Sequence, residues 1–206
     1  MLAEAPTVIL ANGAGAVDIA QAAQLPLARL RGQVTHLAQE LGPRLSLAVC
    51  REAYVTPPNQ GVICAGATYS SDDEKELRAS CQQENLARLA EIIPGDAVAA
   101  LATSAPLAGR VGFRCAAPDR LPLVGPLPDY GSSGRIERLR DLPVHAGLYS
   151  LLGYASRGII WSTLMAELLV SQLEQRPLPL EATLVDALVP GRFMLKQRRR
   201  ASSPDA

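Results

Sequence analysis

Histidine and aromatic residues are scarce in this sequence, which has two histidines and 4% aromatic residues among its 206 positions. A Ser-His-Asp triad would need His36 or His145 beside a nucleophile on a strained G-x-S-x-G turn, and the sequence contains no such pentapeptide. Metal-dependent hydrolysis is disfavoured too. A catalytic metal needs histidine, cysteine and carboxylate ligands at close spacing, and the sequence is poor in such ligands. The sequence therefore argues against both hydrolytic classes of enzyme.

Paired cysteines and long apolar runs are also missing. The four cysteines lie far apart, without a C-x-x-C pair or a histidine at metal-ligand spacing, so we expect reduced thiols and no disulfide scaffold. No apolar run is long enough to cross a bilayer, and no basic-then-apolar leader opens the chain. These features predict a soluble, cytoplasmic protein without a membrane partner.

Excess charge of either sign is absent, since 20 basic residues balance 20 acidic ones. No overall field therefore favours nucleic acid or a membrane surface as the partner. The basic residues are nevertheless concentrated near the end of the chain, at Arg192, Lys196 and 198–200. We interpret the end of this run, Arg198 to Arg200, as a solvated tail, with contact to a tRNA backbone as the alternative.

A hydrophobic content of 48% is enough to build a sizeable core. The stretch "PTVILANGAGA" predicts a buried strand over 7–11, followed by a glycine turn and a short alanine-rich helix. "GAGAVD" resembles a dinucleotide fingerprint, but Asp18 stands where its third glycine should be. Taken alone, it fits an ordinary strand-to-helix turn as well.

The middle of the chain predicts an antiparallel sheet with one helix. Short apolar segments bounded by turn residues indicate strands at 30–37, at 45–50 with an extension at 53–56, at 61–65 and at 111–115. Ser71 and Glu74 have the spacing of a capping box, which predicts that a helix begins there and runs to residue 93. We expect the Pro- and Gly-rich segment 126–143 to be an exposed loop that joins two lobes.

The stretch "LLGYASRGIIWSTLMAELLVSQLEQRPLPLE" (151–181) predicts a strand, a glycine turn and a long helix that ends before two prolines. Glycines at the start of a helix leave its free N–H groups open to a flat, polar or anionic ligand. An ordinary capped helix is the alternative interpretation.

Several stretches together resemble the D-amino-acid oxidase and glycine oxidase superfamily of flavin-dependent oxidoreductases. They are "RLRGQVTHL", "GATYSSDD", "GFRCAAPDRLPLVGPLPD", "GYASRGIIW" and "LVDALVPGRFMLKQRRR", in the order of the family. Within the superfamily, they are most similar to the oxidoreductase half of enzymes that modify the wobble uridine of tRNA. The resemblance runs over nearly the whole chain.

The resemblance implies a mixed α/β fold, with part of an FAD-binding Rossmann-like domain and an antiparallel-sheet substrate domain of the D-amino-acid oxidase type. The implied organisation is a returning segment of the FAD-binding domain (1–28), the substrate-domain sheet with a helix (29–118, helix 72–93), a return to the FAD-binding domain with a long helix (119–190, helix 158–175), and a basic tail (191–206). The expected opening motif, G-x-G-x-x-G with a ribose-binding acid, does not precede Pro6. We therefore expect the chain to begin within the flavin domain, with the N-terminal flavin-binding half and a methyltransferase domain as missing partners that another chain would supply unless the gene is truncated.

The resemblance also implies FAD as the cofactor and assigns site residues. Arg114 would bind a substrate carboxylate, with a structural salt bridge as the alternative. Gly32 would pass flat against the flavin ring unless it is a bulge glycine, and Tyr54 and Tyr69 would line the substrate pocket unless they belong to the core. The remaining flavin contacts would be Gly153, Ser156, Arg157, Gly158 and Ile159 at the pyrimidine side, and Ala11, Gly13 and Ala14 at the ADP half.

The implied function is FAD-dependent removal of the carboxymethyl group from 5-carboxymethylaminomethyl-(2-thio)uridine at the wobble position of tRNA. Hydride transfer from a neutral amine needs no strong protein base, which suits a sequence poor in histidine. Two alternatives remain open: a small-molecule amine or amino-acid oxidase of the same superfamily, and a truncated, non-catalytic remnant.

Overall fold

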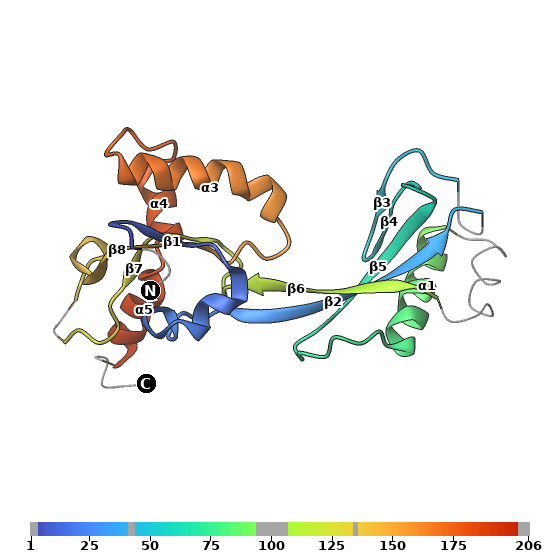
Figure 1. Ribbon diagram of the computed structural model, residues 1–206, viewed down its shortest axis with the longest axis horizontal. Helices are drawn as coiled ribbons and strands as arrows, with labels where there is room; N and C mark the ends of the chain where they lie inside the picture. The colour runs from blue at the N-terminus through green and yellow to red at the C-terminus, as the bar shows by residue number, and fades with distance from the viewer. Residues whose placement is uncertain (1–3, 41–43, 94–106, 134–135, 202–206) are drawn as a thin grey trace. The chain divides into compact units, whose positions relative to one another are not determined.

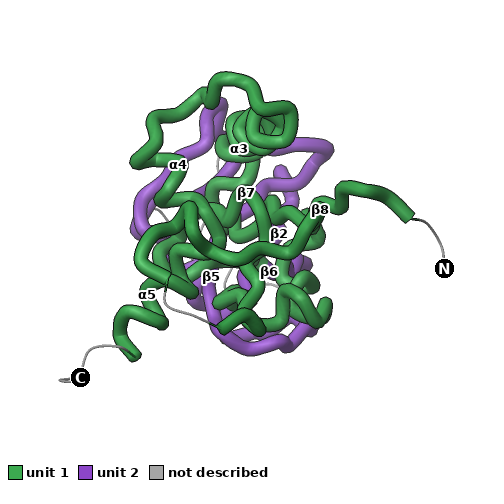
Figure 2. Tube along the Cα trace, turned by 90° about the vertical axis from the view of Figure 1, so that its left-hand side faces the viewer, with its two compact units in different colours: residues 1–29, 114–206 green, residues 30–113 purple. Residues whose placement is uncertain are grey.

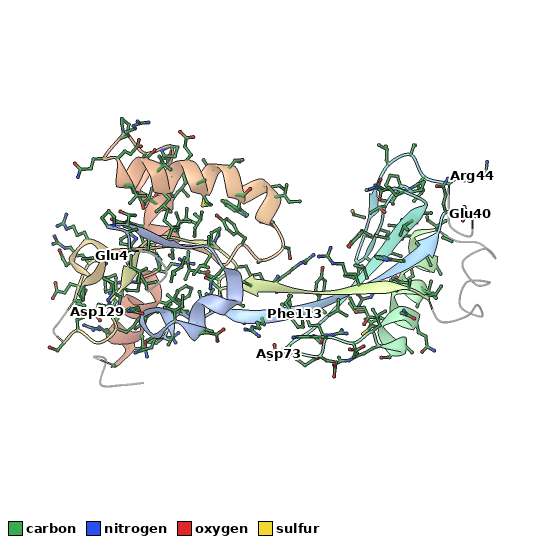
Figure 3. All side chains as sticks on the ribbon, viewed as in Figure 1. Glu4, Glu40, Arg44, Asp73, Phe113 and Asp129 are labelled. Carbon is green, nitrogen blue, oxygen red and sulfur yellow. The ribbon has the colours of Figure 1, made fainter. Side chains whose placement is uncertain are left out.

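The computed structural model describes residues 4–40, 44–93, 107–133 and 136–201 (Figure 1). The chain forms two compact units (Figure 2). The discontinuous unit contains residues 1–29 and 114–206, and the inserted unit contains residues 30–113. Two strands cross the boundaries between them in sequence, β2 (Ala28–Ala38) and β6 (Gly109–Ala116). The exposed Phe113 of β6, labelled in Figure 3, is the last residue of the inserted unit.

The discontinuous unit has a three-stranded sheet in the order β1-β8-β7. The strand predicted at 7–11 is confirmed as β1 (Val8–Leu10), which runs parallel to β8 (Val144–Leu152) with Val8 opposite Leu148. β7 (Leu123–Pro128) is antiparallel to β8. Within the described residues, β1 pairs on one side only, and Val8 and Ile9 are 45% and 43% exposed.

Three α-helices complete the described part of this unit. The predicted long helix is α3 (Gly158–Leu173), whose Met165, Leu168 and Leu169 pack with Val124 of β7. α4 (Ala182–Leu188) joins the same core cluster. The segment interpreted as a basic tail is instead helical as α5 (Arg192–Ala201), because Met194 and Leu195 are buried and anchor it. Residues 202–206 of the expected tail lie outside the described residues.

The inserted unit is an antiparallel sheet in the order β3-β4-β5-β2-β6, with α1 (Ala79–Ile92) on one face. Its other strands are β3 (Val49–Cys50), β4 (Tyr54–Val55) and β5 (Val62–Ser70). β2 alternates strictly, since its odd-numbered residues from 31 to 37 are buried and its even-numbered ones are half-exposed. Leu37, Ile63 and Leu89 are among the core residues that join this buried face to α1.

The capping box predicted at Ser71 and Glu74 was wrong. The helix begins at Ala79, and the carboxylate of Glu74 instead accepts hydrogen bonds from the N–H groups of Lys75 and Glu76, at 2.9 and 3.1 Å. Asp72 forms an ion pair with Arg78 at 2.7 Å, and this hydrogen-bonded guanidinium holds the pKa of Asp72 well below its usual range. These local contacts favour a turn over a first helical turn.

The prediction that 126–143 is a loop joining two lobes was also wrong. Pro126 and Leu127 lie within β7, and the segment leads from β7 to β8 of the same sheet. It includes a short 3-10 helix, η3 (Leu139–Asp141), and both of its ends belong to the discontinuous unit.

Candidate functional site

Three segments that are distant in sequence meet at Cys115, near the end of β6. A Cβ atom on Gly13 would lie 4.0 Å from the Cβ of Cys115, so the turn after β1 reaches this strand. From the other side, Ala155 donates its N–H to the carbonyl oxygen of Cys115 at 2.8 Å. Arg114 precedes this junction directly. The structure thus brings together Gly13, Arg114 and the turn of residues 153–158, which the sequence pointed to separately.

The turn between β8 and α3 needs glycine at position 153. Gly153 has a φ of +74°, and a Cβ there would lie 2.7 Å from Cδ1 of Leu123. Gly158 is different, because a Cβ would only touch the Cβ of Tyr154 at an ordinary 3.6 Å and no positive φ is required. Packing therefore explains Gly153 but leaves the missing side chain of Gly158 unexplained.

The first turn of α3 is open. Trp161 donates the first helical N–H, to the carbonyl oxygen of Arg157 at 2.9 Å, so the N–H groups of 158–160 have no partner within the helix. No side chain caps them, and no acidic residue lies in the first turn. The side chain of Ile159 is 95% exposed. The turn can therefore receive a polar or negatively charged edge of a ligand, which the helix dipole would stabilise.

Arg114 extends to the mouth of this helix. Its Nη1 donates a hydrogen bond to Oγ of Ser156 at 2.8 Å. This bond fixes the direction of the guanidinium, and a carboxylate clamp requires a guanidinium of fixed direction. Two groups nearby are held neutral, because burial raises the pKa values of the Cys115 thiol and the Tyr154 phenol.

The predicted site residues of the inserted unit share one face of its sheet. Gly32 pairs with Tyr69, and a Cβ on Gly32 would lie 3.4 Å from Cε1 of Tyr69. Tyr54 pairs with Gly66, which also pairs with Val34 of β2. Since paired residues point to the same side, the two tyrosines lie on the face opposite α1. Tyr69 is 46% exposed, so the interpretation as a core residue does not apply to it.

Two structural arginines were missed by the sequence reasoning. Arg31 is 1% exposed and donates to the carbonyl oxygens of Glu74 and Glu76, at 2.7 and 2.6 Å. Arg192 forms a bidentate ion pair with Asp119, at 2.8 and 3.0 Å. Burial would raise the pKa of Asp119, but the hydrogen bonds from Arg192 and from backbone N–H groups leave it lowered. One signal was available, because an arginine within an apolar alternation must find partners for its charge.

Neither a metal centre nor a membrane span emerges from the described residues. They contain no group of three or more His, Cys, Asp or Glu side chains that could hold a metal ion. None of their helices is long and apolar enough to cross a bilayer.

Two curated relatives match nearly the whole chain. A protein of Aromatoleum aromaticum is 49% identical over 199 residues, which are 96% of this chain and 31% of the relative. A protein of Azoarcus sp. is 48% identical over 206 residues, covering 100% of this chain and 32% of the relative. Both are named tRNA 5-methylaminomethyl-2-thiouridine biosynthesis bifunctional protein MnmC. The chain thus spans less than a third of the length of these relatives.

Two solved structures titled as oxidases share the fold of this chain. Glycine oxidase from Geobacillus kaustophilus matches with a TM-score of 0.68 and 21% identity, covering 90% of this chain and 45% of that one. Iminodiacetate oxidase from Chelativorans sp. BNC1 matches with a TM-score of 0.67 and 24% identity, covering 91% and 47%. These likenesses confirm the predicted fold class. The model of the FAD dependent oxidoreductase family matches residues 2–172, and the chain belongs to that family.

Proposed function

We propose that this chain forms part of an FAD-dependent oxidase that acts on 5-carboxymethylaminomethyl-(2-thio)uridine at the wobble position of tRNA. The observation that carries the proposal is the meeting of Gly13, Arg114 and the open first turn of α3 at Cys115. The name of the relatives refers to the biosynthesis of a modified thiouridine of tRNA, and this supports tRNA as the substrate. The products would be the aminomethyl nucleoside and glyoxylate.

FAD fits the features of the site. When bound, it supplies a two-electron acceptor. The open N–H groups of α3 suit its polar pyrimidine edge, with Gly153, Ser156, Arg157, Gly158 and Ile159 as the contacts. Ala11, Gly13 and Ala14 would contact the ADP half. Gly32 remains our prediction for the ring face, and Tyr54 and Tyr69 remain predictions for the substrate pocket.

The role of Arg114 is to orient the substrate. Its guanidinium would hold the carboxylate of the carboxymethyl group, which fixes the adjacent carbon for oxidation. The substrate loses two electrons and two hydrogens, so a C=N bond forms between its amine nitrogen and that carbon. Water then adds to the carbon and the C–N bond breaks, releasing glyoxylate and the aminomethyl group. None of these steps requires a histidine base.

A chimera tests the proposal directly. In the Aromatoleum relative, the aligned 199 residues would be replaced by this chain. We expect the purified chimera to show flavin absorption near about 450 nm and to convert the carboxymethylaminomethyl nucleoside of tRNA, followed by mass spectrometry of digested RNA. Turnover of glycine or iminodiacetate but not of tRNA would favour the small-molecule oxidase. A folded chimera without flavin would favour the remnant.

Replacing Arg114 by lysine in this chimera is expected to raise KM and lower kcat, with kcat/KM falling by about tenfold or more. An ammonium ion cannot copy the planar fork that fixes a carboxylate. Steady-state kinetics measure the effect, with Arg110→Lys as a matched control on the same strand. A kcat/KM of Arg114→Lys within a factor of two of the parent would show that Arg114 does not bind the substrate.

Gly158→Val in the chimera is expected to weaken FAD binding by roughly tenfold while changing stability little, since a Cβ at this position would meet no crowded atom. Gly153→Val is the contrasting variant, because its Cβ would collide with Leu123 and it should unfold the turn. Flavin titration and thermal melting separate the two effects. Equal losses of binding and stability in Gly158→Val would support a simple capped helix instead.

A further inference from the structure

α5 concentrates positive charge on a single helix. Its ten residues contain five cations and no acidic residue. Met194 and Leu195 are buried, and Phe193 packs against a core cluster of the discontinuous unit. The apolar side of the helix is therefore used for folding, and Lys196, Arg199 and Arg200 are exposed on the remaining surface.

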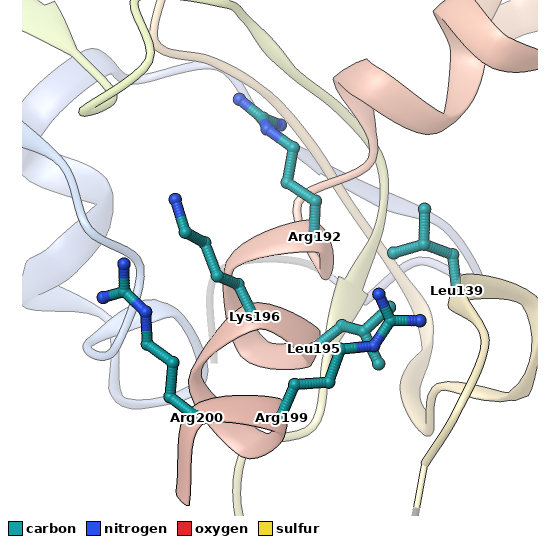
Figure 4. A pocket seen from close by; sticks show the side chains of 6 residues that line it. All are labelled: Leu139, Arg192, Leu195, Lys196, Arg199 and Arg200. Carbon is teal, nitrogen blue, oxygen red and sulfur yellow. The ribbon is translucent and has the colours of Figure 1, made fainter. Parts of the chain in front are cut away.

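A pocket of about 470 Å³ lies beside this helix (Figure 4). Four of its six lining residues are basic, and none is acidic: the lining is Leu139, Arg192, Leu195, Lys196, Arg199 and Arg200. Two of the lining arginines are held in place by hydrogen bonds to backbone carbonyl oxygens. Arg192 donates to the carbonyl oxygens of Leu188 and Val189, at 3.0 and 3.1 Å, and Arg199 donates to that of Glu137 at 2.6 Å.

Lys196 and Arg200 are the cations of the pocket that the fold does not use. Within the described residues, neither has a hydrogen bond or an ion pair, whereas Arg192 is paired with Asp119. They stand four residues apart on α5, and their side chains extend in the same direction (Figure 4). Like charges at this spacing repel each other and destabilise a helix slightly. A bound anion would attract both cations and offset their mutual repulsion.

We propose that this α5 pocket binds the phosphate backbone of an RNA substrate, away from the nucleoside that reacts. The inference rests on the proposed function and adds a contact surface to it. RNA phosphates suit a row of cations at helical spacing, because phosphate contacts are made largely by lysine and arginine. A membrane surface is disfavoured, since an interfacial helix inserts its apolar face and that face of α5 is buried.

The test uses the full chain and a fluorescently labelled anticodon stem-loop RNA. Binding is followed by fluorescence anisotropy over a series of KCl concentrations. We expect K196Q/R200Q to bind about tenfold more weakly at low salt, with the slope of log K against log[KCl] reduced by roughly 1.4, for two lost phosphate contacts. The control R110Q/R176Q removes the same charge from exposed positions elsewhere and should stay within about twofold of the parent.

Three results would overturn the proposal: equal losses in both double variants, displacement of the RNA by millimolar inorganic phosphate alone, and tighter binding to anionic phosphatidylserine vesicles than to RNA. Circular dichroism of both variants verifies that α5 is still folded. The proposed function fails independently of this result. If the chain binds RNA through the pocket but the chimera lacks oxidase activity, the RNA-binding surface is supported and the proposed reaction is contradicted.

Discussion

Replacing Arg31 with methionine is expected to lower the free energy of unfolding of the inserted unit by about 3 kcal/mol. The side chain is 1% exposed and joins β2 to the segment that precedes α1. It donates to the carbonyl oxygens of Glu74 and Glu76 and, at 3.0 Å, to Oε1 of Gln33. Methionine would fill much of the volume but leave these acceptors without their donor, and buried acceptors left unpaired are costly.

The measurement must report on the inserted unit alone. The single tryptophan, Trp161, belongs to the discontinuous unit, so its fluorescence is a poor probe of this change. Hydrogen exchange of the β5 amides, with urea unfolding followed by circular dichroism, reports on the correct unit. Arg110→Met, at an exposed position of β6, is the control and should change stability by less than about 0.5 kcal/mol. A loss below about 1 kcal/mol for Arg31→Met would show that solvent replaces its contacts.

The 206-residue chain by itself is expected to bind FAD with a dissociation constant weaker than about 1 μM, a binding free energy smaller than about 8 kcal/mol. In this fold class the pyrophosphate lies at the N-terminus of the helix that follows a G-x-G-x-x-G turn. Here the "GAGAVD" segment forms a 3-10 helix of six residues, Gly13–Asp18, in place of a long α-helix. Its dipole is therefore small, and no glycine stands at position 18.

The same chain is expected to self-associate. β1 has one edge without a partner strand among the described residues, and this edge with the exposed Val8 and Ile9 offers a template for another strand. Flavin fluorescence titration and size-exclusion chromatography test the two expectations, with Ile9→Lys as the variant that should restore the monomer. A monodisperse monomer with submicromolar affinity for FAD would contradict both.

Local patterns predicted the elements whose environment is ordinary. β1 and α3 were found because an apolar run and a helical periodicity bounded by prolines have few other interpretations. β7 was missed because Pro126 and Pro128 suggested a loop. Within the described sheet, β7 lies at an edge, where a residue without an N–H costs no ladder bond on the open side.

Long-range contacts account for the other errors. Ser71 and Glu74 fit a capping box, yet buried Arg31 binds the carbonyl oxygens of this segment and delays the helix to Ala79. Residues 191–206 were interpreted as a basic tail, because the sequence could not show that Asp119 would bind Arg192 and that a helix would form there. For the site, glycine turns pointed to Gly13 and Gly153, and the family resemblance assigned Arg114. That Cys115 joins them is a tertiary fact without a local signal.

The interrupted sequence of the discontinuous unit has a consequence for the order of folding. The inserted unit is one continuous stretch, so all of its strands and α1 are available as soon as residue 113 has been synthesised. β1 cannot pair until Leu148 and its neighbours in β8 exist. Since domains fold as units during synthesis and distant pairings are slow, we expect the inserted unit to fold first on the ribosome. Until β8 is made, the exposed Val8 and Ile9 of β1 lack the strand with which they pair in the folded unit, and a chaperone would protect them during that interval.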